Sequence, residues 1–347
     1  MSARASDPKA DGPTIAAVVR QQTGVAWSRA RGLCMEGRVT LNGERCLDPA
    51  SRVSPGTVVA VDQHARKLPT GPLAGSAIVF CDQDVVVVDK PAGMLSVADE
   101  PGNKDTLVDH TRTLLRQMGR RGVDAKLGVV HRLDRDTSGL MMFTRTAEAK
   151  RMLAAQFRDH TIDRVYHAIA HGAVARTRVE THLVLDRGDG LRGSLEHLRA
   201  SRSGVRPWGG PAGSLEHFRA SRSGIRPGSS NGYLRRPSGE ATQDARRSVT
   251  HVTPIEQLIG ATLVECRLET GRQHQIRIHL SELGHPLVGE RVYIRDYAGP
   301  KLEAVRPMLH ARTLGFAHPR TGERIAFDRE PPADFQAALQ SLRPAHR

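Results

Sequence analysis

The stretch that decides the fold reads LGVVHRLDRDTSGLMMFTRT and runs from Leu127 to Thr146. It is an apolar run that polar residues interrupt in its middle, including His131, Arg132, Asp134, Arg135 and Asp136. Carboxylates and guanidinium groups rarely become buried without partners, because removing a lone charge from water costs a large free energy. The interruption therefore indicates either a functional site or a polar loop in which the two aspartates pair with the two arginines.

Segments with strand and helix patterns surround this stretch. Val85–Val88 is a β-branched run typical of a buried strand, and Lys90-Pro91-Ala92-Gly93 predicts a sharp turn directly after it. We expect further strands at residues 165–170, 262–268 and 309–316, and helices at residues 106–116 and 146–157. A second dense polar run, Gly271 to Leu280, follows the strand at 262–268. Two polar segments thus interrupt the apolar pattern of this part of the chain.

Length and composition limit the class of protein. The chain has 347 residues, of which 39% are hydrophobic, enough for two domains. It has no apolar run near the roughly 20 residues of a membrane span, and its start lacks the apolar core of a signal peptide. Its four cysteines form no C-x-x-C pair, so we expect free thiols and no structural metal site. The sequence predicts a soluble, cytoplasmic protein, and nothing in it suggests more than a monomer.

The charge of the chain points toward a polyanionic partner. Lys and Arg number 51 against 37 Asp and Glu, which gives a formal net charge of +14. Such a surplus attracts nucleic acid over several ångströms and makes the binding salt-dependent. Basic charge by itself does not specify which nucleic acid is bound.

The chain divides into a small and a large domain. Residues 1–12 are expected to be a disordered tail, and 13–63 to form two helices and a small sheet. Residues 64–76 are rich in Pro and Gly and predict a linker. We expect a second domain over 77–335 and a C-terminal tail over 336–347, whose residues form either a short helix or an extended tail.

The small domain resembles the RNA-binding domain first described in ribosomal protein S-four. The resemblance rests on Ser28-Arg29, Gly37-Arg38-Val39, Asn42-Gly43 and Gly56. In that family the helices bind structured RNA, so the resemblance implies that Arg29, Arg31 and Arg38 contact phosphates. The alternative is a folded module whose basic face is simply solvated.

Residues 191–247 differ in character from the rest of the large domain. Of these 57 residues 22 are Gly, Pro or Ser, and 11 arginines stand against 4 acidic residues. The segment also repeats itself, since Gly193–Pro207 recurs with two changes as Gly213–Pro227. We expect a disordered insertion. It is interpreted either as a tolerated surface loop or as an arginine-rich RNA clamp.

Five motifs of the large domain occur in the order typical of the RluA-type pseudouridine synthases, which the chain resembles over about residues 77–333. They are Asp89-Lys90-Pro91-Ala92-Gly93, then His131-Arg132-Leu133-Asp134 with Thr137-Ser138-Gly139-Leu140, the strand around Tyr166, Thr270-Gly271-Arg272 leading to His274-Gln275-Ile276-Arg277, and Leu309-His310-Ala311 with His318-Pro319. The chain departs from the family pattern at Gln273, at Arg164 (where Lys is usual) and in its long insertion. The resemblance implies an α+β fold with a mixed, mainly antiparallel sheet, flanking helices and a central cleft.

The resemblance also implies an activity and a set of roles. Pseudouridine synthases isomerise uridine in RNA, which needs a flipped base and a carboxylate but no cofactor or metal. Asp134 would be that carboxylate, and Arg277 would hold its pKa down by pairing with it. Tyr166 would pack on the uracil and assist proton transfer, and Arg132 would fill the gap that the base leaves. His131 and Lys90 are further expected substrate-binding residues.

Competing interpretations concern individual residues. Asp136 lies two residues from Asp134, and a carboxylate pair suggests glycoside hydrolysis, but only 4% of the residues are aromatic and sugar clefts need such rings. We therefore expect a structural salt bridge for Asp136. His274 and His279 lack the i, i+4 spacing of a helical zinc pair and are expected to be structural.

The additional RNA-binding domain favours a large structured RNA, and the resemblance to synthases of this architecture implies large-subunit ribosomal RNA as the partner. Transfer RNA remains open. A different class of function is a catalytically inactive RNA-binding or assembly protein on the same fold, and a third is a glycosylase that frees uracil.

Overall fold

The computed structural model describes residues 12–46, 49, 51–63, 73–98, 105–119, 127–186, 191–202, 245–294 and 297–344. The chain separates into two compact units at Leu73 and Ala74, within the segment expected to be a linker. The expected N-terminal tail lies outside the described residues except for Gly12. Within the described ranges no helix is both long and apolar enough to span a membrane.

The first unit contains two helices and a three-stranded sheet, as predicted. Its elements are α1 (Ile15–Thr23), α2 (Trp27–Met35), β1 (Val39–Leu41), β2 (Glu44–Arg45) and β3 (Val59–Val61), with the strand order β2-β1-β3. Helix α1 begins where the Thr14 hydroxyl accepts from the Ala17 amide, and it ends at Gly24 in the left-handed conformation. Side chains from α1, α2 and β1 form its buried core.

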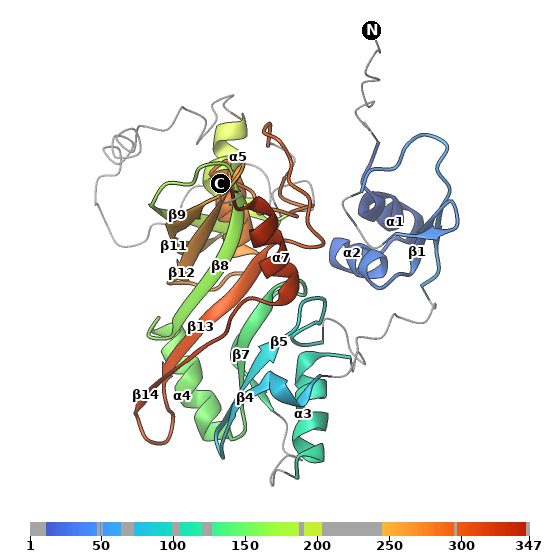
Figure 1. The fold of residues 1–347 in the computed structure, drawn as a ribbon. Coiled ribbons are helices and arrows are strands. Elements are labelled where there is room, and N and C mark those ends of the chain that lie inside the picture. The colour runs from blue at the N-terminus through green and yellow to red at the C-terminus, as the bar shows by residue number, and fades with distance from the viewer. Residues whose placement is uncertain are drawn as a thin grey trace, which may run out of the picture. The chain divides into compact units, whose positions relative to one another are not determined.

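The second unit is built on one large sheet. Its strands are β4 (Ile78–Cys81), β5 (Val85–Lys90), β6 (Gly128–Val129), β7 (Ser138–Thr144), β8 (Asp163–His171), β9 (Thr177–Val184), β10 (Gly193–Ser194), β11 (Arg246–Gln257), β12 (Ala261–Leu268), β13 (Leu309–Ala317) and β14 (Arg324–Asp328). Their order is β10-β9-β11-β12-β8-β13-β7-β5-β4, with β14 on β13 and β6 on β7 (Figure 1). Among the described pairs only β7 and β13 run parallel. The predicted α+β class with a mainly antiparallel sheet is confirmed.

Five helices in the described part of the chain accompany this sheet, and α4 and α7 bury apolar side chains against it. The five are α3 (Leu107–Gln117), α4 (Ala147–Arg158), α5 (Leu195–Arg202), α6 (Gln275–Glu282) and α7 (Ala333–Leu342), and a 3-10 turn (Gly75–Ala77) precedes β4. The Leu153 side chain of α4 packs in a cluster with residues of β5, β7 and β13. Phe335 and Leu339 of α7 pack with residues of β8 and β12. Separate clusters therefore support the two halves of the sheet.

The expectation that the whole insertion is disordered needs correction, whereas one alternative for the C-terminus is found. Residues 191–202, expected to be disordered, form β10 and α5, and 246–247 belong to β11. Glu196 of α5 accepts from the His182 amide, and the Ser194 amide donates to Glu282 of α6, so the start of the insertion is fixed to the sheet edge. Residues 203–244 lie outside the described part of the chain. Of the two alternatives for residues 336–347 the structure has the helix, since most of α7 lies there and Leu339 packs in the core.

Candidate active site

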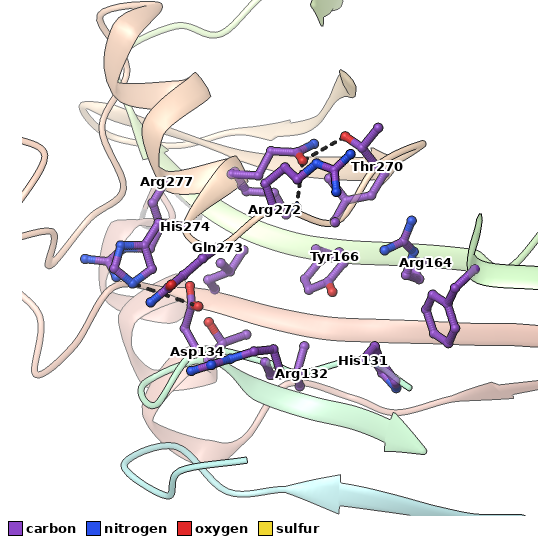
Figure 2. Close-up of a pocket in the computed structure, with 18 of the residues that line it drawn as sticks. His131, Arg132, Asp134, Arg164, Tyr166, Thr270, Arg272, Gln273, His274 and Arg277 are labelled. Carbon is purple, nitrogen blue, oxygen red and sulfur yellow. Dashed lines mark hydrogen bonds and ion pairs between the residues drawn. The ribbon is translucent and has the colours of Figure 1, made fainter. Parts of the chain in front are cut away.

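A cavity of about 480 Å³ lies where the two polar segments of the sequence meet. Residues from the loop between β6 and β7, from β8 and from the segment leading into α6 line it (Figure 2). The lining includes Arg132, Asp134, Tyr166, His274 and Arg277. The volume is within the range of ordinary ligand sites. The structure thus joins residues that are far apart in the chain, such as Asp134 and Arg277, which are separated by 143 positions.

Lys90 holds the loop that carries Asp134. Its ammonium group is fully buried and donates to the carbonyl oxygens of Pro91, Arg135 and Thr137 at 3.0, 2.8 and 2.8 Å. An ammonium group has three donors, so this geometry uses all of them. Burial lowers the Lys90 pKa to about 7, and nearby aspartates oppose that effect. The residue was expected to bind substrate, but it does not line the cavity and acts as a support below it.

Arg306, which the sequence analysis did not single out, supports the same loop from another side. Its guanidinium donates to the Asp136 carbonyl and the Ser138 hydroxyl, and it pairs with Asp334 of α7 at 2.6 Å. Next in the loop, Gly139 has a φ of +111°, and a Cβ there would collide with the Ala311 backbone of β13. Glycine is therefore required where the loop enters β7.

Asp134 lies at one end of the cavity with 18% of its side chain exposed. Its Oδ1 is 3.9 Å from Nε2 of His274, whose Nδ1 is 2.7 Å from the Tyr293 hydroxyl. Burial raises the Asp134 pKa, while the charges of Arg277 and Arg132 oppose the rise. The expectation that a cation holds this pKa down is therefore wrong in its net direction, because desolvation outweighs the nearby positive charges.

Arg277 lines the same end of the cavity but pairs elsewhere. Its Nε and Nη2 donate to the two carboxylate oxygens of Glu290, both at 2.7 Å, and its guanidinium lies over the Tyr293 ring. Glu290 is fully buried and also accepts from backbone amides that include Val292. The charge of Glu290 and its hydrogen bonds raise the Arg277 pKa, although burial opposes this. Glu290 stands in a loop without a recognisable polar pattern, so it could not be selected from the sequence.

Tyr166 projects from the centre of β8 into the cavity and is only 8% exposed. Burial raises the pKa of its hydroxyl to about 12. Arg164, two residues earlier on the same strand, faces the same cavity, because alternate residues of a strand share a face. Figure 2 shows Tyr166 between Asp134 and Arg164.

His131 and Arg132 both line the cavity, as expected of substrate-binding residues. The His131 ring stacks on Phe157, and its Nε2 accepts from the Met142 amide at 3.0 Å. Burial lowers the His131 pKa to about 3, so the ring is neutral at physiological pH. Arg132 is exposed to solvent, which suits contact with a ligand. His131 is therefore partly structural.

The second polar segment is the N-terminus of a helix, which the sequence analysis did not predict. His274 has a φ of +60° and precedes α6, and the Thr270 hydroxyl donates to Gln275 at 2.8 Å. His279, within the helix, hydrogen-bonds the hydroxyl groups of Thr181 and Thr250, which confirms its expected structural role. The expected salt bridge of Asp136 is not found among the described residues, where its carbonyl oxygen accepts from Arg306.

Two of the three arginines expected to contact RNA form ion pairs within the first unit. Arg29 and Arg38 both form ion pairs with Glu36, at 3.4 and 3.0 Å, and Glu36 is nearly buried. Arg31 is half-buried on α2. These contacts fix two guanidinium groups beside the end of α2 and leave phosphate binding a prediction.

Potential metal ligands come together in the described residues at Asp82, Asp84 and His318, outside the cavity. Both carboxylate oxygens of Asp84 accept from Arg320, at 2.5 and 3.0 Å, and His318 is 2.7 Å from Asp82. The polar groups of this cluster therefore already have partners within the protein, with Arg320 as the cation.

Comparisons with known proteins agree with this architecture. Residues 84–282 match the family described as RNA pseudouridylate synthase, and residues 17–59 match the S4 domain. The chain is 37% identical over 282 residues to ribosomal large subunit pseudouridine synthase D of Zymomonas mobilis, which covers 78% of this chain and 74% of that protein. It is 31% identical to the RNA pseudouridine synthase YlyB of Bacillus subtilis, over 91% of this chain and 90% of that protein.

A solved structure shares the fold. Human RNA pseudouridylate synthase domain containing 4 superposes with a TM-score of 0.53 at 20% identity, over 76% of this chain and 92% of the human one. The family match covers more than half of the chain, and the two relatives cover 78% and 91% of it. The chain therefore belongs to the RNA pseudouridylate synthase family, with an S4 domain before its catalytic unit, as the sequence predicted.

Proposed function

We propose that this protein isomerises uridine to pseudouridine in large-subunit ribosomal RNA, with Asp134 as the catalytic carboxylate. One observation carries the assignment. Asp134 is the only carboxylate among the described residues that line the cavity, whereas five arginines line it. An RNA substrate brings negative charge into such a site, and a single acidic group is what the isomerisation requires.

The bonds that change define the tasks of these residues. The bond between uracil N1 and the ribose anomeric carbon breaks, a bond between uracil C5 and the same carbon forms, C5 loses a proton and N1 gains one. The ionised Asp134 attacks the sugar or the ring, or removes a proton near it. Tyr166 packs on the uracil and is placed to take part in the proton transfer.

The surrounding groups prepare this carboxylate. Arg277, held by Glu290, places a fixed positive charge near Asp134 that favours its ionised form. Arg132 is exposed beside Asp134 and fills the space in the RNA that the flipped uridine leaves. The S4 domain binds the RNA outside the cavity through Arg29, Arg31 and Arg38.

The RNA class rests on the relatives. Proteins named ribosomal large subunit pseudouridine synthase D match this chain at 30 to 37% identity. The S4 domain adds a second RNA-binding surface, which suits a large structured RNA. We propose the same substrate class here, with transfer RNA as the alternative.

Release of tritium from RNA labelled at uridine C5 tests the reaction. The wild-type protein releases tritium and frees no uracil. An inactive RNA-binding protein on the same fold would release none, and a glycosylase would free the base. Carbodiimide mapping of total RNA from cells without the protein then identifies the uridine, and a lost modification outside large-subunit ribosomal RNA would contradict the substrate class.

A further inference from the structure

Arg164 stands at the end of the cavity opposite Asp134 and lacks an acidic partner. Only 7% of the surface of this residue is accessible to solvent. Its Nη2 donates to the Glu269 carbonyl at 3.0 Å, and its buried Nε has no hydrogen-bond partner. The Glu269 carboxylate is engaged with Arg178, Arg247 and His251. Among the described residues, then, no carboxylate compensates this guanidinium.

Neighbouring residues hold the Arg164 guanidinium in this position. It lies 5.4 Å from the centre of the Phe157 ring. Its Nη1 occupies the space that a Cβ on residue 271 would fill, so Gly271 makes room for it. Burial lowers the Arg164 pKa, and the charge of Arg272 acts in the same direction. Leaving a cation so placed is costly, and such a cost is tolerated where a ligand supplies the missing charge.

The neighbouring lining residues are also basic or neutral. Arg158, His160 and Arg272 complete this end of the cavity, and all three are exposed. Arg158 has only a distant pairing with Asp159, at 4.0 Å. Guanidinium groups offer several donors in a fixed plane that matches the oxygen atoms of a phosphate.

We infer that Arg164, with Arg158 and Arg272 at its rim, forms a subsite for one backbone phosphate of the RNA next to the uridine in the cavity. The inference rests on the proposed function, because phosphate is the anionic group that an RNA substrate carries. Tyr166 separates this subsite from Asp134 (Figure 2), so the phosphate would hold the nucleotide at one end while the carboxylate acts at the other.

The test measures binding separately from turnover. In an Asp134→Asn background, affinity for a transcript of large-subunit ribosomal RNA is determined over a range of salt concentrations. Arg164→Gln is expected to weaken binding about tenfold and to reduce the slope of log affinity against log salt by about 0.7 to 0.9, the value for one phosphate contact. Arg164→Lys keeps a positive charge and is expected to keep the slope.

Arg151→Gln is the matched control, because it removes one arginine from the exposed face of α4, where Arg151 pairs with Glu148. It should leave the slope unchanged. An unchanged slope in Arg164→Gln overturns the subsite. If Arg164→Gln does not fold, as judged by thermal unfolding, neutral methylphosphonate linkages beside the mapped uridine replace it in RNA bound to the otherwise native protein.

At least one methylphosphonate linkage must lower the salt slope by the amount expected for one phosphate contact. If no linkage does so, the subsite is overturned. Failure of the proposed function can be distinguished from failure of the subsite. A wild-type protein that releases no tritium is not a synthase, whereas the salt slope still decides whether Arg164 binds phosphate.

Discussion

The two ends of the cavity each contain a buried arginine, and the two are treated differently. Arg277 is 9% exposed and shares two hydrogen bonds with the carboxylate of Glu290. Arg164 is 7% exposed and donates to one backbone oxygen. A compensated charge is part of the fixed electrostatics of a site, whereas an uncompensated one becomes complete only when an anion binds. This difference agrees with our two proposals, in which the Asp134 end carries out the chemistry and the Arg164 end binds the RNA.

The largest expected effect separates Asp134 from its neighbour Asp136, which does not line the cavity. Asp134→Asn should reduce turnover at least about a thousandfold, because the amide is neither a nucleophile nor a base, while RNA affinity stays within a few-fold. Asp136→Asn is the matched control, since it removes a charge two residues away, and it should retain most of the activity. Tritium release and filter binding measure the two quantities. Comparable losses in both variants would contradict the assignment.

Stability sharpens the comparison of the two arginines. Glu290→Gln should lower the free energy of unfolding by about 3 to 5 kcal/mol, because it leaves Arg277 buried without its partner. Arg164→Gln removes an uncompensated charge and should change the same quantity by less than about 1.5 kcal/mol in the free protein. Urea titrations of both variants provide the measurement, and equal losses would break the distinction.

The pH dependence of kcat/KM tests the state of Asp134. The carboxylate acts when ionised, so kcat/KM should fall as the pH drops through its pKa, which burial places above the ordinary value near 4. In Glu290→Gln the nearby negative charge is gone and Arg277 is no longer neutralised. Both changes favour ionised Asp134, so the acid limb should move to lower pH. A shift to higher pH would show that Glu290 does not act through this charge balance.

The smallest effect is expected at a surface remote from both ends. Deleting residues 193–212 places Gly213-Ser214-Leu215-Glu216-His217 where the identical Gly193-Ser194-Leu195-Glu196-His197 now stands. Ser194 and Glu196 make the contacts of this segment to α6 and β9, and both residue types are restored. Turnover and melting temperature should stay within error of the wild type. A loss in either would assign a function to the repeat.

Much of the catalytic unit could be predicted because its features are local in the sequence. The β-branched run Val85–Val88 became β5, and Thr146 caps α4 as expected. The predicted turn at Lys90 to Gly93 is also present, and its Gly93 amide donates to Arg135 in the loop before β7. These features depend on backbone conformation and side-chain pattern, which neighbouring residues determine.

Helix α6 was missed because its residues do not show a helical apolar stripe. Gln275 and Arg277 are buried in it along with Ile276 and Ile278, so buried residues occur on all sides. Gln275 is satisfied by Thr270, Val249 and Thr250, all outside the helix. Helix prediction from sequence assumes that polar residues face water. In α6 this assumption fails, because tertiary hydrogen bonds allow its polar side chains to be buried.

The sequence by itself predicted Asp134, Tyr166 and Arg277 as members of one family pattern, and in the structure all three line the same cavity. Only the tertiary structure decided which charges meet. The sequence predicted that Arg277 pairs with Asp134, but in the structure Arg277 pairs with Glu290. Arg164 donates to a backbone oxygen and pairs with no carboxylate among the described residues. Charge pairing depends on distances and burial between segments far apart in the chain, and these exist only once the strands and helices have packed.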